Sequence, residues 1–220
     1  MTPNLKTSLL LAALSLAYAN PGFATAIDTI QGSASNAGPI ESTQSALSFR
    51  TGPGGSYHFT VLKFDFQNGD VSPLNFTFNV DLYAVGSSPG YFPTGTSLAQ
   101  TNLLTGTMDA LTTAVLTYTT LGALGSYSLA ANTGYALVLS GTSGSLAWLA
   151  GGSTPVTGDG FTLLQGFNFN DGSWYTAGND PLRVTIQVSE TSIPEPASFG
   201  LLGLGLGLMA FAKSRKANQA

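Results

Sequence analysis

The stretch that most clearly indicates the fold is Phe-Thr-Phe-Asn-Val-Asp-Leu-Tyr-Ala at residues 76–84. Apolar and polar side chains alternate along most of it, and a period of two is typical of a strand with one buried face. The neighbouring runs are short and are divided by Gly, Ser, Thr, Asn and Pro, with no helical period among them. The sequence therefore predicts an all-β domain.

A second run, at residues 57–66, alternates too, but its apolar phase switches between Val61 and Leu62. A slip of one residue turns side chains to the other face, so this run needs a β-bulge or a strand covered on both faces. Further strands are expected at residues 114–118, 135–140, 146–149, 161–165 and 182–188. About seven to nine short strands favour an antiparallel β-sandwich of jelly-roll type.

The segment at residues 27–45 is rich in Ser, Ala and Gly, which leaves two interpretations open. It is either a poorly ordered lead-in or an edge strand of the sandwich. Together with the strands above, it places the boundaries of the β-domain at residues 27–192.

The composition excludes several classes of protein. The chain has 220 residues, the length of one domain with appendages. Only 8% of the residues are charged and there is no Cys, which excludes polybasic nucleic-acid binders, coiled coils, disulfide-rich domains and thiolate chemistry. Between Ile27 and Ile193, three basic residues stand against ten acidic ones, a balance of −7. That balance argues against nucleic acid and anionic lipid as partners.

The N-terminus has the pattern of a secretory signal. Lys6 precedes an apolar run at residues 9–19 that is too short to span a bilayer. Asn-Pro-Gly at residues 20–22 follows, and Ala24 and Ala26 then supply small residues. This order predicts a signal peptide over residues 1–26, which directs export of the chain by the Sec machinery and is cleaved off after Ala26 or after Ala24. The alternative is a buried N-terminal helix.

The C-terminus has three parts. The first is a Pro-Glu-Pro motif at Pro194, Glu195 and Pro196. Sixteen residues without charge follow at 197–212, and a basic cluster closes the chain with Lys213, Arg215 and Lys216. An apolar run of this length with basic flanks predicts a transmembrane helix with its basic end in the cytoplasm and the β-domain outside. The alternative is a buried core helix.

This tripartite order over residues 193–220 resembles the PEP-CTERM sorting signal. The resemblance implies export in a Gram-negative bacterium and recognition by the membrane-embedded exosortase, which would remove the helix near the Pro-Glu-Pro motif. It implies an inner-membrane anchor, transient or retained, before the cell surface or extracellular matrix is reached. It also implies a setting of biofilm and exopolysaccharide.

The β-domain has a second, more diffuse resemblance. Ser-Phe-Arg-Thr-Gly at residues 48–52 is one element, and residues 78–83 followed by Gly-Thr-Ser-Leu-Ala at 95–99 form another. The strongest is Leu-Ala-Ala-Asn-Thr-Gly-Tyr-Ala-Leu-Val-Leu at 129–139. Their order over most of residues 45–188 resembles the choice-of-anchor extracellular domains, most nearly the R type. That resemblance implies no activity and no site residues.

No catalytic constellation stands out. His58, the one histidine, is expected on a strand surface, and the Gly-Ser-Ser-Pro-Gly match at residues 86–90 reads as a turn because Pro89 cannot donate to an oxyanion. Four acids sit in turn contexts that explain them without a substrate: Asp70, Asp159, Asp171 and Asp180. We expect no catalytic residues, metal ligands or cofactor. Structural calcium at residues 168–172 stays open, although the spacing is not that of an EF-hand.

The aromatic residues support one binding hypothesis. Trp174 and Tyr175 follow a turn and could stack on sugar rings, whose C–H-rich faces pack on aromatic surfaces. Adjacent strand residues point to opposite faces, so one of the two at most would face a ligand. Trp148 is expected in the core. The alternative for Trp148, Trp174 and Tyr175 is that their rings pack in the core or at the edge of the domain and bind no ligand.

These observations together predict an exported, non-enzymatic protein that acts as a structural or adhesive component of the cell surface or exopolysaccharide matrix. One alternative is a carbohydrate-binding module that holds matrix polysaccharide. A second alternative is an extracellular glycosidase, which would need two facing carboxylates in one cleft.

Overall fold

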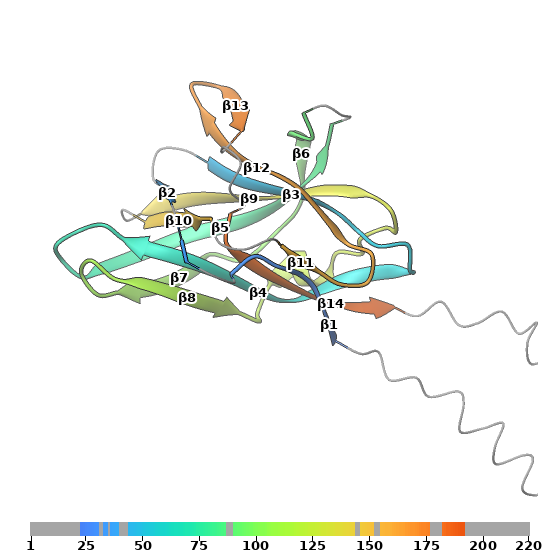
Figure 1. The fold of residues 1–220 in the computed structure, drawn as a ribbon, viewed down its shortest axis with the longest axis horizontal. Coiled ribbons are helices and arrows are strands. Elements are labelled where there is room, and N and C mark those ends of the chain that lie inside the picture. Colours follow the sequence, from blue (N-terminus) through green and yellow to red (C-terminus); the bar gives the residue numbers. More distant parts are fainter. Residues whose placement is uncertain are drawn as a thin grey trace, which may run out of the picture.

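The computed structural model describes residues 23–30, 33–34, 36–39, 44–86, 90–143, 146–151, 155–176 and 182–191. In this part of the chain two seven-stranded sheets form, and all of their pairings are antiparallel (Figure 1). The prediction of an all-β, antiparallel domain is confirmed. A jelly-roll connectivity stays a prediction.

The first sheet runs in the order β11, β1, β14, β4, β10, β2, with β8 also paired to β4. Its strands are β11 (Val156–Thr157), β1 (Phe23–Asp28), β14 (Val184–Thr191), β4 (Ser56–Asn68), β10 (Leu146–Ala150), β2 (Asn36–Pro39) and β8 (Thr113–Tyr118).

The second sheet runs in the order β13, β12, β3, β9, β5, β6, with β7 also paired to β5. Its strands are β13 (Ser173–Thr176), β12 (Thr162–Asn170), β3 (Gln44–Arg50), β9 (Gly134–Ser143), β5 (Leu74–Val85), β6 (Pro93–Gln100) and β7 (Leu104–Met108). One short helix, α2 (Gly122–Ser126), lies between β8 and β9.

The core lies between the two sheets. In β5 the apolar phase of the quoted stretch is buried, from Phe76 to Leu82, and it faces aromatic side chains of the first sheet. The Phe64 ring meets Phe78 with 6.0 Å between ring centroids and Trp148 with 5.4 Å, both edge to face. Burying each of these side chains contributes about 1.5–3 kcal/mol. Trp148 is fully buried, as predicted.

β4 contains the predicted phase switch. Tyr57 and Phe59 are buried, and the buried phase resumes at Leu62. The register with β14 shifts at the same place, where Val61 lies opposite Gln187 and Phe59 lies opposite Val188. Thr60 is therefore the extra residue of a bulge, one position before the expected one, and its buried hydroxyl has no partner among the described residues.

Several strands lie where the sequence predicted none or predicted one only as an alternative. The segment at residues 27–45 contains the end of β1, the start of β3 and the edge strand β2, which supports the edge-strand alternative. β6 and β7 were missed because Pro, Gly and Thr interrupt their apolar pattern. No helix in the described residues is long and apolar enough to cross a membrane.

Both ends of the described chain lie at one end of the sandwich. Phe23, the first residue of β1, pairs with Ser189, close to the end of β14 at Thr191 (Figure 1). The thirteen residues of β4 span about 40 Å from that end to the other.

Two turns of the described chain, residues 69–73 and 109–112, lie at the opposite end of the sandwich. The Leu111 amide donates to the Asp70 carbonyl (3.0 Å), which holds the turns together. Each presents an apolar side chain to solvent, with Val71 83% and Leu111 65% exposed. Leu111 also has a φ of 54°, a left-handed conformation that is strained for a bulky residue. We call Val71 and Leu111 the apolar tip.

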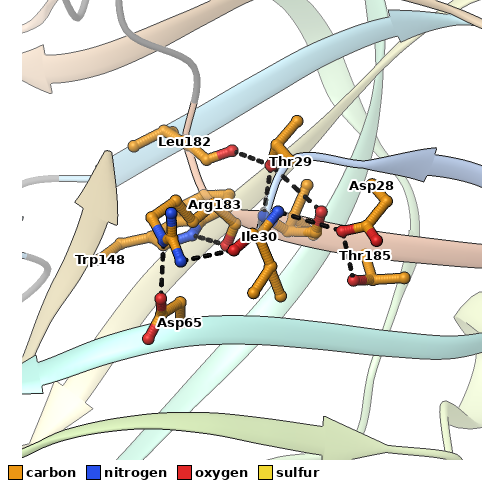
Figure 2. Close-up of polar contacts among 9 residues, drawn as sticks. Asp28, Thr29, Ile30, Asp65, Trp148, Leu182, Arg183 and Thr185 are labelled. Carbon is orange, nitrogen blue, oxygen red and sulfur yellow. Dashed lines mark hydrogen bonds and ion pairs between the residues drawn. The ribbon is translucent and has the colours of Figure 1, made fainter. Parts of the chain in front are cut away.

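A buried polar network ties the first strand to the last (Figure 2). The Arg183 guanidinium pairs with the Asp65 carboxylate at 2.7 Å and donates to the carbonyl of Ile30. The Arg183 carbonyl accepts from the Trp148 indole at 2.8 Å. The Thr29 hydroxyl donates to the Leu182 carbonyl at 2.6 Å. The segment that follows β1 is therefore fixed against the start of β14 by hydrogen bonds rather than by apolar contact alone.

Candidate functional site

A second cluster of apolar side chains gathers on the outer face of the second sheet. Ala46 and Val138 face each other across β3 and β9, in the phase opposite to the core residues Leu47 and Leu137. They and Phe167 are buried, and four larger side chains cover them in part: Tyr83, Tyr91, Phe92 and Trp174. We call these seven residues the outer-face cluster. The β12–β13 and β5–β6 hairpins, which supply part of it, project from the same side of the molecule (Figure 1).

Trp174 and Tyr175 take different roles in this arrangement. Trp174 is half-buried and packs on Phe169 of the paired strand, with 5.0 Å between ring centroids. Tyr175 is 56% exposed. Trp174 thus stabilises the hairpin, and Tyr175 is the ring that a ligand in solution can reach.

Sequence reasoning missed the other aromatic residues of the outer-face cluster. Tyr83 stands in the polar phase of the stretch at residues 76–84, and an aromatic residue in that phase was the available signal. Phe92 packs on Phe167 with 4.8 Å between ring centroids, although no strand pattern surrounds it. Tyr91 has a φ of 48°, and its carbonyl accepts a hydrogen bond from the Ser48 hydroxyl at 2.7 Å.

One carboxylate lies beside the outer-face cluster. Asp81 is opposite Val138 in the β5–β9 register, and its Oδ1 accepts from the Ser97 hydroxyl at 2.9 Å. Burial raises the pKa of the nearby Tyr83 phenol, and the charge of Asp81 raises it further. Tyr83 is therefore a neutral phenol at physiological pH. The Asp81 carboxylate is itself buried, so it serves the hydrogen bond with Ser97, and the groups of this region that reach solvent are the partly covered aromatic rings.

His58 has a structural role. It is half-buried on β4, and its Nδ1 lies 3.0 Å from the Tyr127 carbonyl oxygen. A carbonyl only accepts, so Nδ1 carries the proton and donates. The Gly-Ser-Ser-Pro-Gly match has its three central residues outside the described part of the chain.

The acids in turns behave as turn residues. Asp171 and Gly172 both have positive φ and join β12 to β13 in a two-residue hairpin turn. Asp159 has a φ of 51°, and the Asp70 amide donates to the Asn68 side chain. Asp180 lies outside the described residues.

One side-chain oxygen of the possible calcium-binding loop at residues 168–172 forms a hydrogen bond within the domain. The Asn168 Oδ1 accepts from the Ser45 hydroxyl at 3.0 Å, which occupies one of its oxygen ligands. Over the described ranges, no three His, Asp or Glu side chains come together to hold a metal ion.

Of the residues predicted for export and sorting, the structure describes those at the end of the predicted signal peptide, and residues 1–22 lie outside the described part. Ala24 and Ala26, the predicted cleavage positions, are both part of β1. The C-terminal prediction falls outside the described residues: the transmembrane helix at 197–212, the motif Pro194, Glu195 and Pro196, and the basic residues Lys213, Arg215 and Lys216. β14 ends at Thr191, so two residues separate the last strand from Pro194.

Comparison with known families adds one match to this all-β, antiparallel structure. Residues 192–216 match the PEP-CTERM protein-sorting motif. Signals of this kind are recognised by exosortase, and they imply export and sorting to the cell envelope or surface. Comparison with curated proteins gives no match.

Proposed function

We propose that this chain is a non-enzymatic structural or adhesive protein of the cell surface or the exopolysaccharide matrix, sorted and processed by exosortase. The observation that carries the proposal is the sorting motif at residues 192–216, which starts one residue after the last strand ends. A folded domain joined so closely to its sorting signal is held near the membrane until the signal is cut.

The architecture suits a passive role. The domain belongs to the choice-of-anchor type in this proposal, with a signal peptide before it and a transmembrane helix after it. Asp65 forms an ion pair with Arg183 in the core, and Asp159 and Asp171 occupy left-handed turn positions. Partners would therefore contact the domain through its surface, at the apolar tip and at the outer-face cluster.

Cell fractionation tests the sorting. In cells that have exosortase, we expect the chain to leave the membrane fraction with a C-terminus near the Pro-Glu-Pro motif. In cells without it, we expect full-length chain in the inner membrane. Replacing Pro194, Glu195 and Pro196 with Ala should give the second result in both strains, whereas the control Thr191→Ala should behave as wild type. Full-length chain in the cytoplasm of both strains contradicts the proposal.

A second candidate function is binding of matrix polysaccharide. It is favoured by Tyr175, an exposed ring on a hairpin whose other face is fixed by Trp174. Stacking of one sugar on one such ring is a weak contact, so avidity along a polymer would be needed.

Affinity electrophoresis with neutral polysaccharide measures this binding. We expect Tyr175→Ala to remove the retardation and Tyr175→Phe to preserve it, because the ring supplies the contact. The exposed substitution Val71→Ala, at the apolar tip and outside the β12–β13 hairpin, is the control. Equal retardation of wild type and Tyr175→Ala contradicts a role for this ring, and no retardation of wild type excludes neutral polysaccharide.

A further inference from the structure

β1 includes residues that stand on the signal side of the predicted cleavage positions. It begins at Phe23 and pairs with β14 from Phe23↔Ser189 to Asp28↔Thr185. The pairing therefore uses Phe23, Ala24 and Thr25, which a cut after Ala26 would remove together with Ala26, the residue at the register shift between Thr25 and Ile27. The position of the cut therefore decides whether these residues remain in the sheet of the exported protein.

Two contacts show that this part of β1 is fitted to the rest of the fold. Ala26 is fully buried, and its carbonyl accepts a hydrogen bond from the Gly158 amide at 3.1 Å. A Cβ at position 158 would lie 2.5 Å from the Thr25 carbonyl oxygen, closer than real Cβ contacts. Glycine at position 158 is thus required by the backbone of Thr25, which is upstream of a cut after Ala26.

Cleavage at either predicted position would damage this arrangement. A cut after Ala26 places a new ammonium group on Ile27, which is fully buried, and a buried charge without a partner is costly. It also removes the partners of Gln187, Val188 and Ser189, which leaves that part of β14 as an open edge. A cut after Ala24 removes the pairings of Val188 and Ser189.

The sequence offers an earlier position with the same chemistry. Ala17 and Ala19 form a second pair of small residues with one residue between them, at the end of the apolar run and before Asn-Pro-Gly at residues 20–22. We propose that signal peptidase cuts after Ala19, so that the exported chain begins at Asn20 and keeps all of β1. This inference rests on the proposed export.

Mass spectrometry of the exported protein gives the N-terminus directly. We expect a first residue of Asn20. A first residue of Thr25 or Ile27 overturns the inference but leaves the proposed export intact. A chain that still begins with the signal region and stays in the cytoplasm contradicts the export itself, so the two failures are distinguishable.

Two matched substitutions test the choice of position. Arg is too large and too polar for the small-residue positions before the cut. We expect Ala19→Arg to leave precursor uncleaved or to move the cut, and Ala24→Arg to leave the Asn20 start unchanged. If Ala24→Arg blocks or moves the cut and Ala19→Arg does not, the inference is overturned. Ala24 is the last residue before a cut after Ala24 and the third residue before a cut after Ala26.

A stability measurement tests the physical reason separately from the peptidase. Two chains are compared, one from Asn20 and one from Ile27, both extending to Ala220. We expect the longer chain to melt at the higher temperature, and Gly158→Ala to lower its melting temperature by about 2–4 °C or more. The chain from Ile27 lacks the Thr25 carbonyl, so Gly158→Ala should leave its melting temperature unchanged. Equal effects in both chains would overturn the packing argument.

Discussion

Tyr118 is a phenol whose hydroxyl is buried without a partner among the described residues. Burial raises its pKa to about 12, so the folded state holds the proton more tightly than the unfolded state, whose tyrosines titrate near 10. The contribution of this group to stability is complete below about pH 10 and is lost as the pH rises towards 12.

We expect Tyr118→Phe to be neutral or to stabilise the domain by about 1 kcal/mol, because it removes a buried hydroxyl that makes no hydrogen bond. It should also reduce the loss of stability between pH 10 and 12. The matched control is Tyr57→Phe. The Tyr57 hydroxyl accepts from the Gly54 amide at 2.9 Å, so its removal should destabilise by about 0.5–1.5 kcal/mol. Urea unfolding at pH 8 and pH 11 measures both, and the same sign for the two variants would contradict this reasoning.

The ion pair between Arg183 and Asp65 is a second feature at which substitution should change the stability of the domain. Removing one partner leaves a buried charge, so we expect Arg183→Met to cost about 3–5 kcal/mol in the free energy of unfolding. The double variant Arg183→Met with Asp65→Leu should recover most of that loss, because no charge is then left buried.

Chemical denaturation of the two single variants and the double variant measures this coupling. Asp70→Asn, in an exposed turn, is the control and should change stability by less than about 0.5 kcal/mol. Additive losses in the double variant would show that the two side chains act independently.

In the β12–β13 hairpin, Trp174 packs against the domain and its neighbour Tyr175 is exposed to solvent. We expect Trp174→Ala to destabilise the domain by about 1–3 kcal/mol, since it removes contact with Phe169 and with the outer-face cluster. Tyr175→Ala should change stability by less than about 0.5 kcal/mol. Thermal unfolding of the two variants measures the difference, and equal losses would contradict the roles assigned to the two rings.

The elements also show what the sequence could predict. β5 and β9 were predictable because they alternate or run apolar between clear turns, and the β4 bulge was one of the two solutions that the phase switch allowed. β6 was not, because five consecutive exposed residues give it no buried phase. Its pairing to β5 comes from the tertiary structure, which no local pattern records.

The candidate site was predictable only in part, for a related reason. Trp174 and Tyr175 stood out by residue type. The outer-face cluster did not, because it joins Tyr83, Tyr91 and Phe92 to Phe167, residues from distant parts of the sequence. The side chains that cover Ala46 and Val138 could be found only once the strand order was known.

For the whole molecule, the position of the two chain ends predicts an orientation. If the segment after Thr191 holds the domain at a membrane, the apolar tip lies about 40 Å away, at the far end of β4. The chain contains no Cys, so single Cys residues can be labelled cleanly. We expect a fluorophore at Thr191→Cys to be quenched by spin-labelled lipid and one at Val71→Cys to remain bright.

These labels require the anchored form, obtained from cells without exosortase. A third label at Tyr175→Cys, on the outer-face side of the molecule, provides an intermediate reference. Equal quenching at positions 71 and 191 would mean that the domain lies flat on the membrane, contrary to the expected orientation.

The position of β14 has a mechanical consequence. It lies between β1 and β4 and is hydrogen-bonded to both in antiparallel registers. A pull on its end at Thr191 acts along the strand, across two rows of bonds that lie perpendicular to it. The bonds are then loaded together in shear rather than opened one after another. A domain that is tethered through its last strand can in this way resist flow or traction on the cell without any additional cross-link.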